Sequence, residues 1–89
     1  MKTCVLDGSR LPDAAAVYGA LVRSFGFPAY FGNNPDALWD ALGDYSGEPV
    51  TVTWRDATRS AELLGPDFDA IVAVLQRAGS LGMLKFELA

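Results

Sequence analysis

Histidine is missing from this sequence, and its absence removes several kinds of chemistry at once. Histidine is the commonest general base, the usual partner of a catalytic serine or cysteine, and the commonest metal ligand. With a single cysteine, Cys4, the sequence also lacks the familiar zinc-binding patterns. We therefore expect neither an enzyme nor a metalloprotein, and we expect no cofactor.

Cysteine and long hydrophobic runs are also scarce. Because Cys4 stands alone, no internal disulfide can form, which fits a reducing compartment. We expect this thiol to be buried and inert in the first strand. The apolar run near the N-terminus ends at Asp7, so it is too short for a signal peptide or a membrane span. These features predict a cytoplasmic protein that does not associate with membranes.

What is present is an ordinary globular composition in a short chain. The sequence has 89 residues, of which 51% are hydrophobic and 20% charged, and it contains no repeat or linker. We expect one domain spanning residues 1–89, because two cores of half this size would not hold together. The net charge of −4 argues against a nucleic-acid ligand and favours a positively charged partner.

Strands and helices alternate in the hydrophobic pattern. Proline after asparagine at Asn34 predicts a capped helix start, and Asp56 is expected to cap another helix. Gly43 and Gly47 are expected to end the second helix, and Gly79 and Gly82 to end the last one. The predicted strands are 2–6, 50–54 and 84–88, and the predicted helices lie at 13–25, 35–42, 57–64 and 66–78.

This order, β-α-α-β-α-α-β, predicts an α/β fold. Strands that are separated by helices pair in parallel through right-handed crossovers. We therefore expect a three-stranded parallel sheet packed with four helices. Trp54, at the end of the β-branched second strand, is expected in the core rather than at a contact surface.

Positive charge is absent from the middle of the chain. Between Ser24 and Trp54 there is no lysine or arginine, whereas the rest of the chain carries all seven bases. Seven acids balance those bases outside this span, so the acids within it account for the whole net charge. They are Asp36, Asp40, Asp44 and Glu48.

Three of these acids recur at every fourth position and would lie along one side of the second helix. Like charges at this spacing destabilise a helix by roughly 0.2–0.5 kcal/mol per pair. The helix dipole favours Asp36 near the N-terminal end but does not help Asp40 or Asp44. A sequence selected for stability alone would place a base among them, so the pattern indicates a surface that meets a basic partner.

Aromatic residues surround the same carboxylates. Tyr30 and Phe31 precede the helix, Trp39 lies within it, and Tyr45 follows it. Tyrosine and tryptophan are favoured anchors of protein interfaces. Trp39 also lies off the apolar stripe of its helix, so core packing does not fully explain it. We predict that residues 30–48 form a surface that enters a basic protein site.

Three other interpretations of the aspartates stay open at this point. They could form a solvated face that only keeps the protein in solution. Two of them could act as acid and base, although residues i and i+4 lie about 5–6 Å apart on a convex helix surface, and the chain offers few further groups. They could bind a cation, but aspartates along a helix cannot wrap calcium as a loop does. We expect no catalytic residue and no metal site.

Residues 30–42 read YFGNNPDALWDAL, which resembles the central motif of the barstar family. This family comprises intracellular inhibitors of secreted guanyl-specific ribonucleases of the barnase type. The likeness continues through Pro49 and the pair Trp54 and Arg55 to the last strand. The fold that it implies matches the order of elements predicted above.

The resemblance implies that the second helix and the loop before it enter a ribonuclease active site. Asp40 matches the residue that takes the place of a substrate phosphate and pairs with arginines and the catalytic histidine. Tyr30 matches the tyrosine that stacks on that histidine. The other matched contacts are Gly32, Asn34, Asp36 and Trp39, with Tyr45 beside them.

The sequence departs from the family pattern at the rim of this surface. Arg77 stands where the family has a contacting glutamate, and Asp44 and Tyr45 replace a glycine and a tryptophan. We infer a related ribonuclease with a different charge pattern, and we hypothesise that Asp44 replaces some of the lost acidic charge. The partner-binding site is assigned to Tyr30, Gly32, Asn34, Pro35, Asp36, Trp39, Asp40, Asp44, Tyr45 and Arg77.

A second function is compatible with the same departures. A domain of this fold could serve as an immunity or regulatory module for a different basic toxin or enzyme. The reversed charge at Arg77 keeps this alternative open, because a changed rim could mean a changed class of partner.

Overall fold

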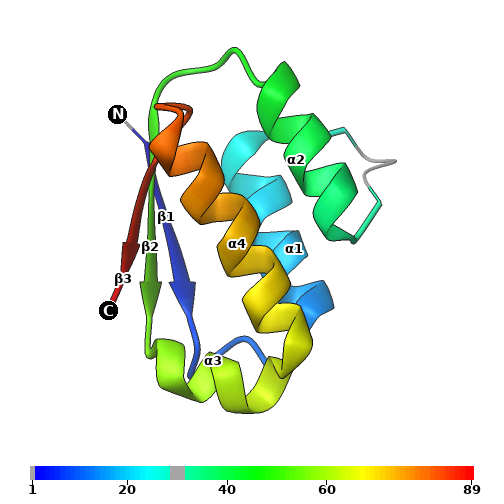
Figure 1. Ribbon diagram of the computed structural model, residues 1–89, viewed down its shortest axis with the longest axis vertical. Helices are drawn as coiled ribbons and strands as arrows, with labels where there is room; N and C mark the ends of the chain where they lie inside the picture. The colour runs from blue at the N-terminus through cyan, green and yellow to red at the C-terminus, as the bar shows by residue number, and fades with distance from the viewer. Residues whose placement is uncertain (1, 29–31) are drawn as a thin grey trace.

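The structure is a computed structural model that describes residues 2–28 and 32–89. Three strands and four helices follow one another in the predicted order β-α-α-β-α-α-β (Figure 1). They are β1 (Lys2–Asp7), α1 (Ala14–Phe25), α2 (Pro35–Asp44), β2 (Val50–Arg55), α3 (Ala57–Leu64), α4 (Pro66–Ser80) and β3 (Lys85–Leu88).

The strands form one parallel sheet in the order β1-β2-β3. In its register Cys4 pairs with Val52, which pairs in turn with Phe86. The helices α1, α2 and α4 lie to one side of the sheet, and α3 crosses the end at which β1 and β2 finish (Figure 1). The predicted parallel α/β sheet is therefore confirmed, with its apolar side chains alternating toward the helices.

Trp54 is the largest side chain of the core and is fully buried. Its ring N–H donates a hydrogen bond to Ser60 Oγ at 2.8 Å, and Phe68 packs edge-on against it with ring centroids 5.0 Å apart. A buried indole N–H needs such a partner. The assignment of Trp54 to the core is thus confirmed.

The thiol of Cys4 lies in the same core, facing the helices from β1. Burial raises the pKa of Cys4 because the thiolate would lose its hydration, although a hydrogen bond with Ser24 opposes the shift. A thiol held neutral in this way is a poor nucleophile. The structure confirms the expectation that Cys4 is buried.

Two helices run slightly past the first glycine that was expected to end them. Gly43 lies within α2 and Gly79 within α4, and neither takes the left-handed conformation in which glycine ends a helix. The helix α2 continues to Asp44 and stops where Tyr45 becomes extended, at φ −70° and ψ 125°. Gly82, the second glycine predicted to close α4, does have the left-handed backbone, at φ 75°, just after the helix.

The predicted cap at Asp56 is also wrong. Asp56 does precede α3, but its backbone is left-handed, at φ 53°, and its side chain makes no capping hydrogen bond. A capping aspartate needs an extended backbone, such as that of Asp13, whose carboxylate accepts a hydrogen bond from the Ala16 N–H at 2.9 Å. The first turn of α3 therefore lacks a side-chain cap.

Candidate functional site

The start of α2 is fixed by the residues that the sequence singled out. The Asn34 side chain accepts a hydrogen bond from the Ala37 N–H at 2.8 Å, and Pro35 occupies the first helical position. Proline brings a preset φ and lacks an N–H that would have no partner there. On the inner side Leu38 and Leu42 are buried, and α2 packs against α4. The helix is thus held rigidly at its start and along one side.

The outer side of α2 carries Asp36, Asp40 and Asp44, all exposed to solvent. Within residues 2–28 and 32–89, no ion pair joins any of the three to a lysine or arginine. Their mutual repulsion is therefore not offset by a described base. The backbone geometry places them along one side, as the four-residue spacing predicted.

Trp39 lies between core and surface, half-buried against α4. The guanidinium carbon of Arg77 lies over the Trp39 ring, 4.7 Å from its centroid. A cation at this distance from a ring face is attracted by the ring electrons. Arg77, an exposed residue of α4, is thus fixed beside α2 by a contact between residues 38 positions apart.

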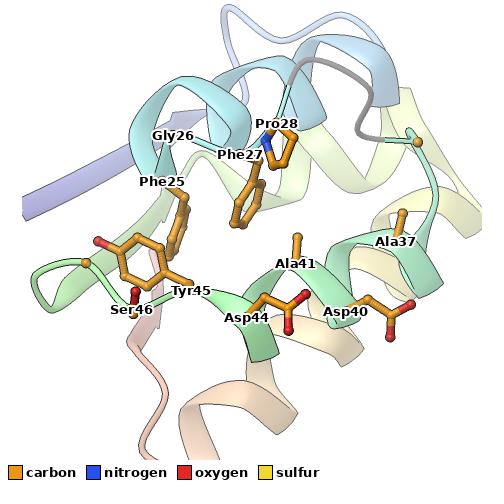
Figure 2. Close-up of a pocket in the computed structure, with 12 residues that line it drawn as sticks. Phe25, Gly26, Phe27, Pro28, Ala37, Asp40, Ala41, Asp44, Tyr45 and Ser46 are labelled. Carbon is orange, nitrogen blue, oxygen red and sulfur yellow. The ribbon is translucent and has the colours of Figure 1, made fainter.

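A groove of about 610 Å³ lies next to the acidic side of α2, between this helix and the end of α1 (Figure 2). On α2 the small side chains of Ala37 and Ala41 leave space for the groove. Phe25, at the end of α1, and Phe27, which follows this helix, line the opposite side. The rings of Phe25 and Phe27 stack, with centroids 5.2 Å apart. The other lining residues are Gly26, Pro28, Gly32, Asp40, Asp44, Tyr45, Ser46 and Gly47.

Tyr45 is held at one end of this groove by contacts at both ends of its side chain. Its hydroxyl donates a hydrogen bond to the Glu48 carbonyl oxygen at 2.6 Å, and its ring meets Phe25 edge-on at 5.1 Å. The chain turns back over the ring at Gly47, where a Cβ would lie 2.5 Å from the tyrosine oxygen. Glycine at this position therefore allows the turn to close on the ring.

These features can be compared with those of known proteins. A family model described as barstar (barnase inhibitor) matches residues 1–87 of the chain. The chain belongs to the barstar family. It is also similar to a Bacillus subtilis (strain 168) protein named "Putative ribonuclease inhibitor YrdF", with 31% identity over 78 residues, which cover 88% of this chain and 86% of that protein.

Membership of the barstar family confirms the resemblance found in residues 30–42. Barstar-family proteins are inhibitors and not enzymes, so the chain is not an enzyme. Within the described part of the chain, no group of three or more His, Cys, Asp or Glu side chains could hold a metal ion. No helix formed by the described residues is both long and apolar enough to cross a membrane.

Most residues assigned to the barstar-like site lie on or beside α2, but they do not form one cluster. Gly32, Asp40, Asp44 and Tyr45 line the groove. Trp39 faces α4 instead, where it meets Arg77. Asn34, Pro35 and Asp36 form the helix start. The predicted contact at Tyr30 lies outside the described residues.

Sequence reasoning missed the aromatic side of the groove. Phe25 and Phe27 are both buried in the core, and the helical pattern does not indicate Phe27 because this residue follows the helix. Phe27 stands between Gly26 and Pro28, two residues that end a helix, and a large apolar side chain in such a connection must pack against another element. The position of Phe27 could therefore have indicated that the segment after α1 contacts α2.

Proposed function

We propose that this barstar-family protein is a ribonuclease inhibitor that binds 1:1 to a guanyl-specific ribonuclease of the barnase type. In this proposal α2 and the loop before it block the active site of the ribonuclease, inside the cell that produces both proteins. The observation that supports it best is the outer side of α2, where three exposed aspartates have no basic partner among the described residues. A ribonuclease active site must bind phosphates, so it offers the complementary positive charge.

Asp40 is the residue that we propose to occupy the position of a substrate phosphate. It lies in the middle turns of a helix whose start is capped by Asn34 and whose inner side is buried. A carboxylate held on such a rigid element can accept short, charge-assisted hydrogen bonds from guanidinium groups, often two in parallel. Because the helix is ordered before binding, less conformational entropy is lost when the complex forms.

The two flanking aspartates would raise the rate at which the partner associates. Asp36 and Asp44 extend the negative charge by one helical turn on either side of Asp40. The concentration of one sign of charge on one surface attracts an oppositely charged partner and raises the rate of productive encounter. Neither aspartate needs a direct contact for this effect.

The proposal is tested by titrating the purified protein into a panel of guanyl-specific microbial ribonucleases and following RNA cleavage. We expect at least one ribonuclease to be inhibited at a 1:1 ratio. Asp40→Ala should abolish this inhibition, whereas Glu62→Ala, which removes an exposed acid from α3, should leave it intact. If no ribonuclease is inhibited at micromolar concentration, the proposal is wrong.

A second candidate, supported by Arg77, is a module of the same fold that binds a different basic toxin or enzyme. The contact with Trp39 fixes a positive charge beside the acidic side of α2, so a matching partner would need basic groups opposite the aspartates and no positive charge opposite Arg77. Arg77→Glu separates the two candidates, since it restores an acidic residue at the rim. Inhibition of the ribonuclease panel by Arg77→Glu but not by the wild-type protein would favour this second function.

A further inference from the structure

The sheet of this protein has a free edge at β3. Its strands follow in the order β1-β2-β3, and no described strand pairs with the outer side of β3. An unpaired edge presents backbone N–H and C=O groups that can pair with a strand of another chain. A groove of about 730 Å³, the edge groove, lies between this strand and α4. It is lined by Gln76, Gly79, Ser80, Leu84, Lys85, Phe86 and Leu88.

The backbone groups of β3 alternate between β2 and the free edge. The Ala89 N–H donates a hydrogen bond to the Trp54 carbonyl oxygen at 2.8 Å, so Ala89 faces β2. Every second residue of a strand faces the same neighbour, which turns the N–H and C=O groups of Phe86 and Leu88 outward. These two residues therefore offer two donors and two acceptors to a further strand.

Gly79 leaves the edge uncovered where α4 passes it. A Cβ at Gly79 would lie 3.6 Å from the Phe86 Cβ and 4.0 Å from the Phe86 backbone nitrogen, which is ordinary contact. Gly79 lies within α4, and alanine favours a helix more than glycine does. Neither crowding nor backbone geometry requires glycine here, whereas a side chain would narrow the approach to the Phe86 N–H.

The charged residues of β3 select one way of pairing two copies of the strand. Lys85 and Glu87 alternate with Phe86 and are exposed. Charged side chains normally protect an edge strand from pairing. When two copies run antiparallel with Phe86 opposite Phe86, however, Lys85 of each copy lies opposite Glu87 of the other. Sliding one strand by two residues instead brings Lys85 against Lys85, or Glu87 against Glu87, and like charges directly opposite are destabilising.

A slide of one residue is excluded by the backbone. It would place the outward-facing groups of Phe86 opposite a residue of the other copy whose groups face β2, so the ladder of hydrogen bonds could not form. The register centred on Phe86 therefore satisfies the hydrogen bonds and the charges together.

We propose that β3 is a dimerisation edge, at which a second copy of this chain pairs antiparallel about a two-fold axis at Phe86. The two three-stranded sheets become one continuous sheet, and the two Phe86 residues exchange backbone hydrogen bonds. Two pairs of Lys85 with Glu87, one on each side of the axis, fix the register. Figure 1 shows β3 and α2 on opposite sides of the molecule, so both acidic surfaces of the dimer stay accessible.

The strand is short, which sets the strength of the dimer. Only four residues, Lys85–Leu88, form β3. Contacts that bury less than about 1,200 Å² belong to weak or transient complexes. We therefore expect a dissociation constant between about 10 μM and 1 mM.

The first test exchanges charges and follows the mass of the particle by sedimentation equilibrium. Lys85→Glu and Glu87→Lys should each weaken dimerisation at least about tenfold, because each places like charges opposite one another. An equimolar mixture of the two variants should recover the dimer, since every pair between the copies is then opposite in sign.

Three results of this experiment would overturn the proposal. The first is a wild-type protein that stays monomeric at about 1 mM, the upper limit of the expected dissociation constant. The second is a mixture no more dimeric than either variant alone. The third is growth beyond a dimer, which would indicate that β3 pairs with the free edge of β1 in the next copy.

The second test removes one outward N–H from the edge. Leu88→Pro lacks the N–H that faces away from β2, whereas Leu88→Ala keeps it and loses most of the same exposed side chain. Leu88→Pro should dimerise at least about tenfold more weakly than Leu88→Ala, because the two-fold axis doubles the loss. Equal dimerisation by the two variants would contradict pairing at this edge.

Amide hydrogen exchange of the unaltered protein tests the same contact without a substitution. Raising the concentration from about 10 μM to 1 mM should slow exchange of the Phe86 and Leu88 N–H groups, which become paired in the dimer. The Glu87 N–H faces β2 in both states and should change least. Exchange at Phe86 and Leu88 that does not depend on concentration would show that no second copy covers this edge.

Discussion

The two tryptophans of this protein show how the same side chain serves different purposes in two regions. Trp54, at the end of β2, is fully buried, hydrogen-bonded to Ser60 and covered by Phe68. Trp39, on α2, is half-buried and carries Arg77 over its ring. Ser60 and Phe68, which contact Trp54, belong to the interior, whereas Trp39 adjoins a charged, solvent-facing surface. The first region holds the fold together, and the second presents a surface.

This difference comes from what covers each ring. Trp54 is enclosed because α3 and α4 close over the end of the sheet, supplying Ser60 and Phe68. Trp39 meets the long side chain of Arg77 from α4, which remains exposed. Substitutions in the two regions should therefore separate effects on folding from effects on binding, and the predictions below are ordered by expected size.

The largest effect is expected for Trp54→Ala. Removing a fully buried aromatic side chain leaves a cavity and should lower the free energy of unfolding by about 3–5 kcal/mol. Trp39→Ala should cost less stability, because its ring is only half-buried. Urea denaturation of both variants measures the difference. Equal losses would mean that the two tryptophans do not belong to different regions.

Asp40→Ala should show the reverse pattern, with a large effect on binding and almost none on folding. Removing one member of a charge pair that is buried in a complex costs about 2–5 kcal/mol of binding free energy. The free protein should become slightly more stable, by roughly 0.2–0.5 kcal/mol for each like-charge pair removed. Calorimetric titration with the ribonuclease and urea denaturation give the two numbers. A marked loss of stability would place Asp40 in the fold rather than at the binding surface.

Ser60→Ala should affect folding alone and by a smaller amount. The substitution leaves the buried ring N–H of Trp54 without its acceptor, which costs about 1–3 kcal/mol. Binding to the ribonuclease should be unchanged, because Ser60 is buried at the end of the sheet near Trp54. Thermal unfolding measures the first effect and inhibition of RNA cleavage the second. Ser60→Thr, which keeps a hydroxyl, is the matched control for loss of the acceptor.

The smallest effect is expected for Arg77→Ala. An exposed contact between a guanidinium and a ring contributes about 0.5–1 kcal/mol to stability. The same substitution in the Trp39→Ala background should have no effect if the ring is what Arg77 contacts. A double-mutant cycle measured by urea denaturation gives this coupling directly. A coupling near zero would separate Arg77 from Trp39.

The sequence predicted the order of the elements because each has a strong local signal. Alternating and helical apolar patterns gave the strands and helices, and Asn34 and Pro35 gave the start of α2. Helix ends were less predictable. Gly43 and Gly79 can adopt a helical backbone as well as a left-handed one, and the surrounding structure decides which. Asp56 has the right side chain for a cap but the wrong backbone for it.

The surface was predictable in its charge but not in its shape. The spacing of Asp36, Asp40 and Asp44 was sufficient to place them along one side of a helix. The contact of Arg77 with Trp39 and the groove between Phe27 and α2 arise from segments far apart or at a chain turn. No local pattern encodes such tertiary neighbours, so the structure was needed to find them.

The three aspartates on α2 also determine how the protein should respond to salt. In the free protein, dissolved ions screen the repulsion between the carboxylates, so a higher ionic strength should make α2, and with it the domain, more stable. In a complex, the same ions screen the attraction to a basic partner and weaken it. Added salt would then raise the stability of the free protein and lower its affinity for the partner. This opposite response is expected of a helix whose charges favour recognition at the expense of its own stability.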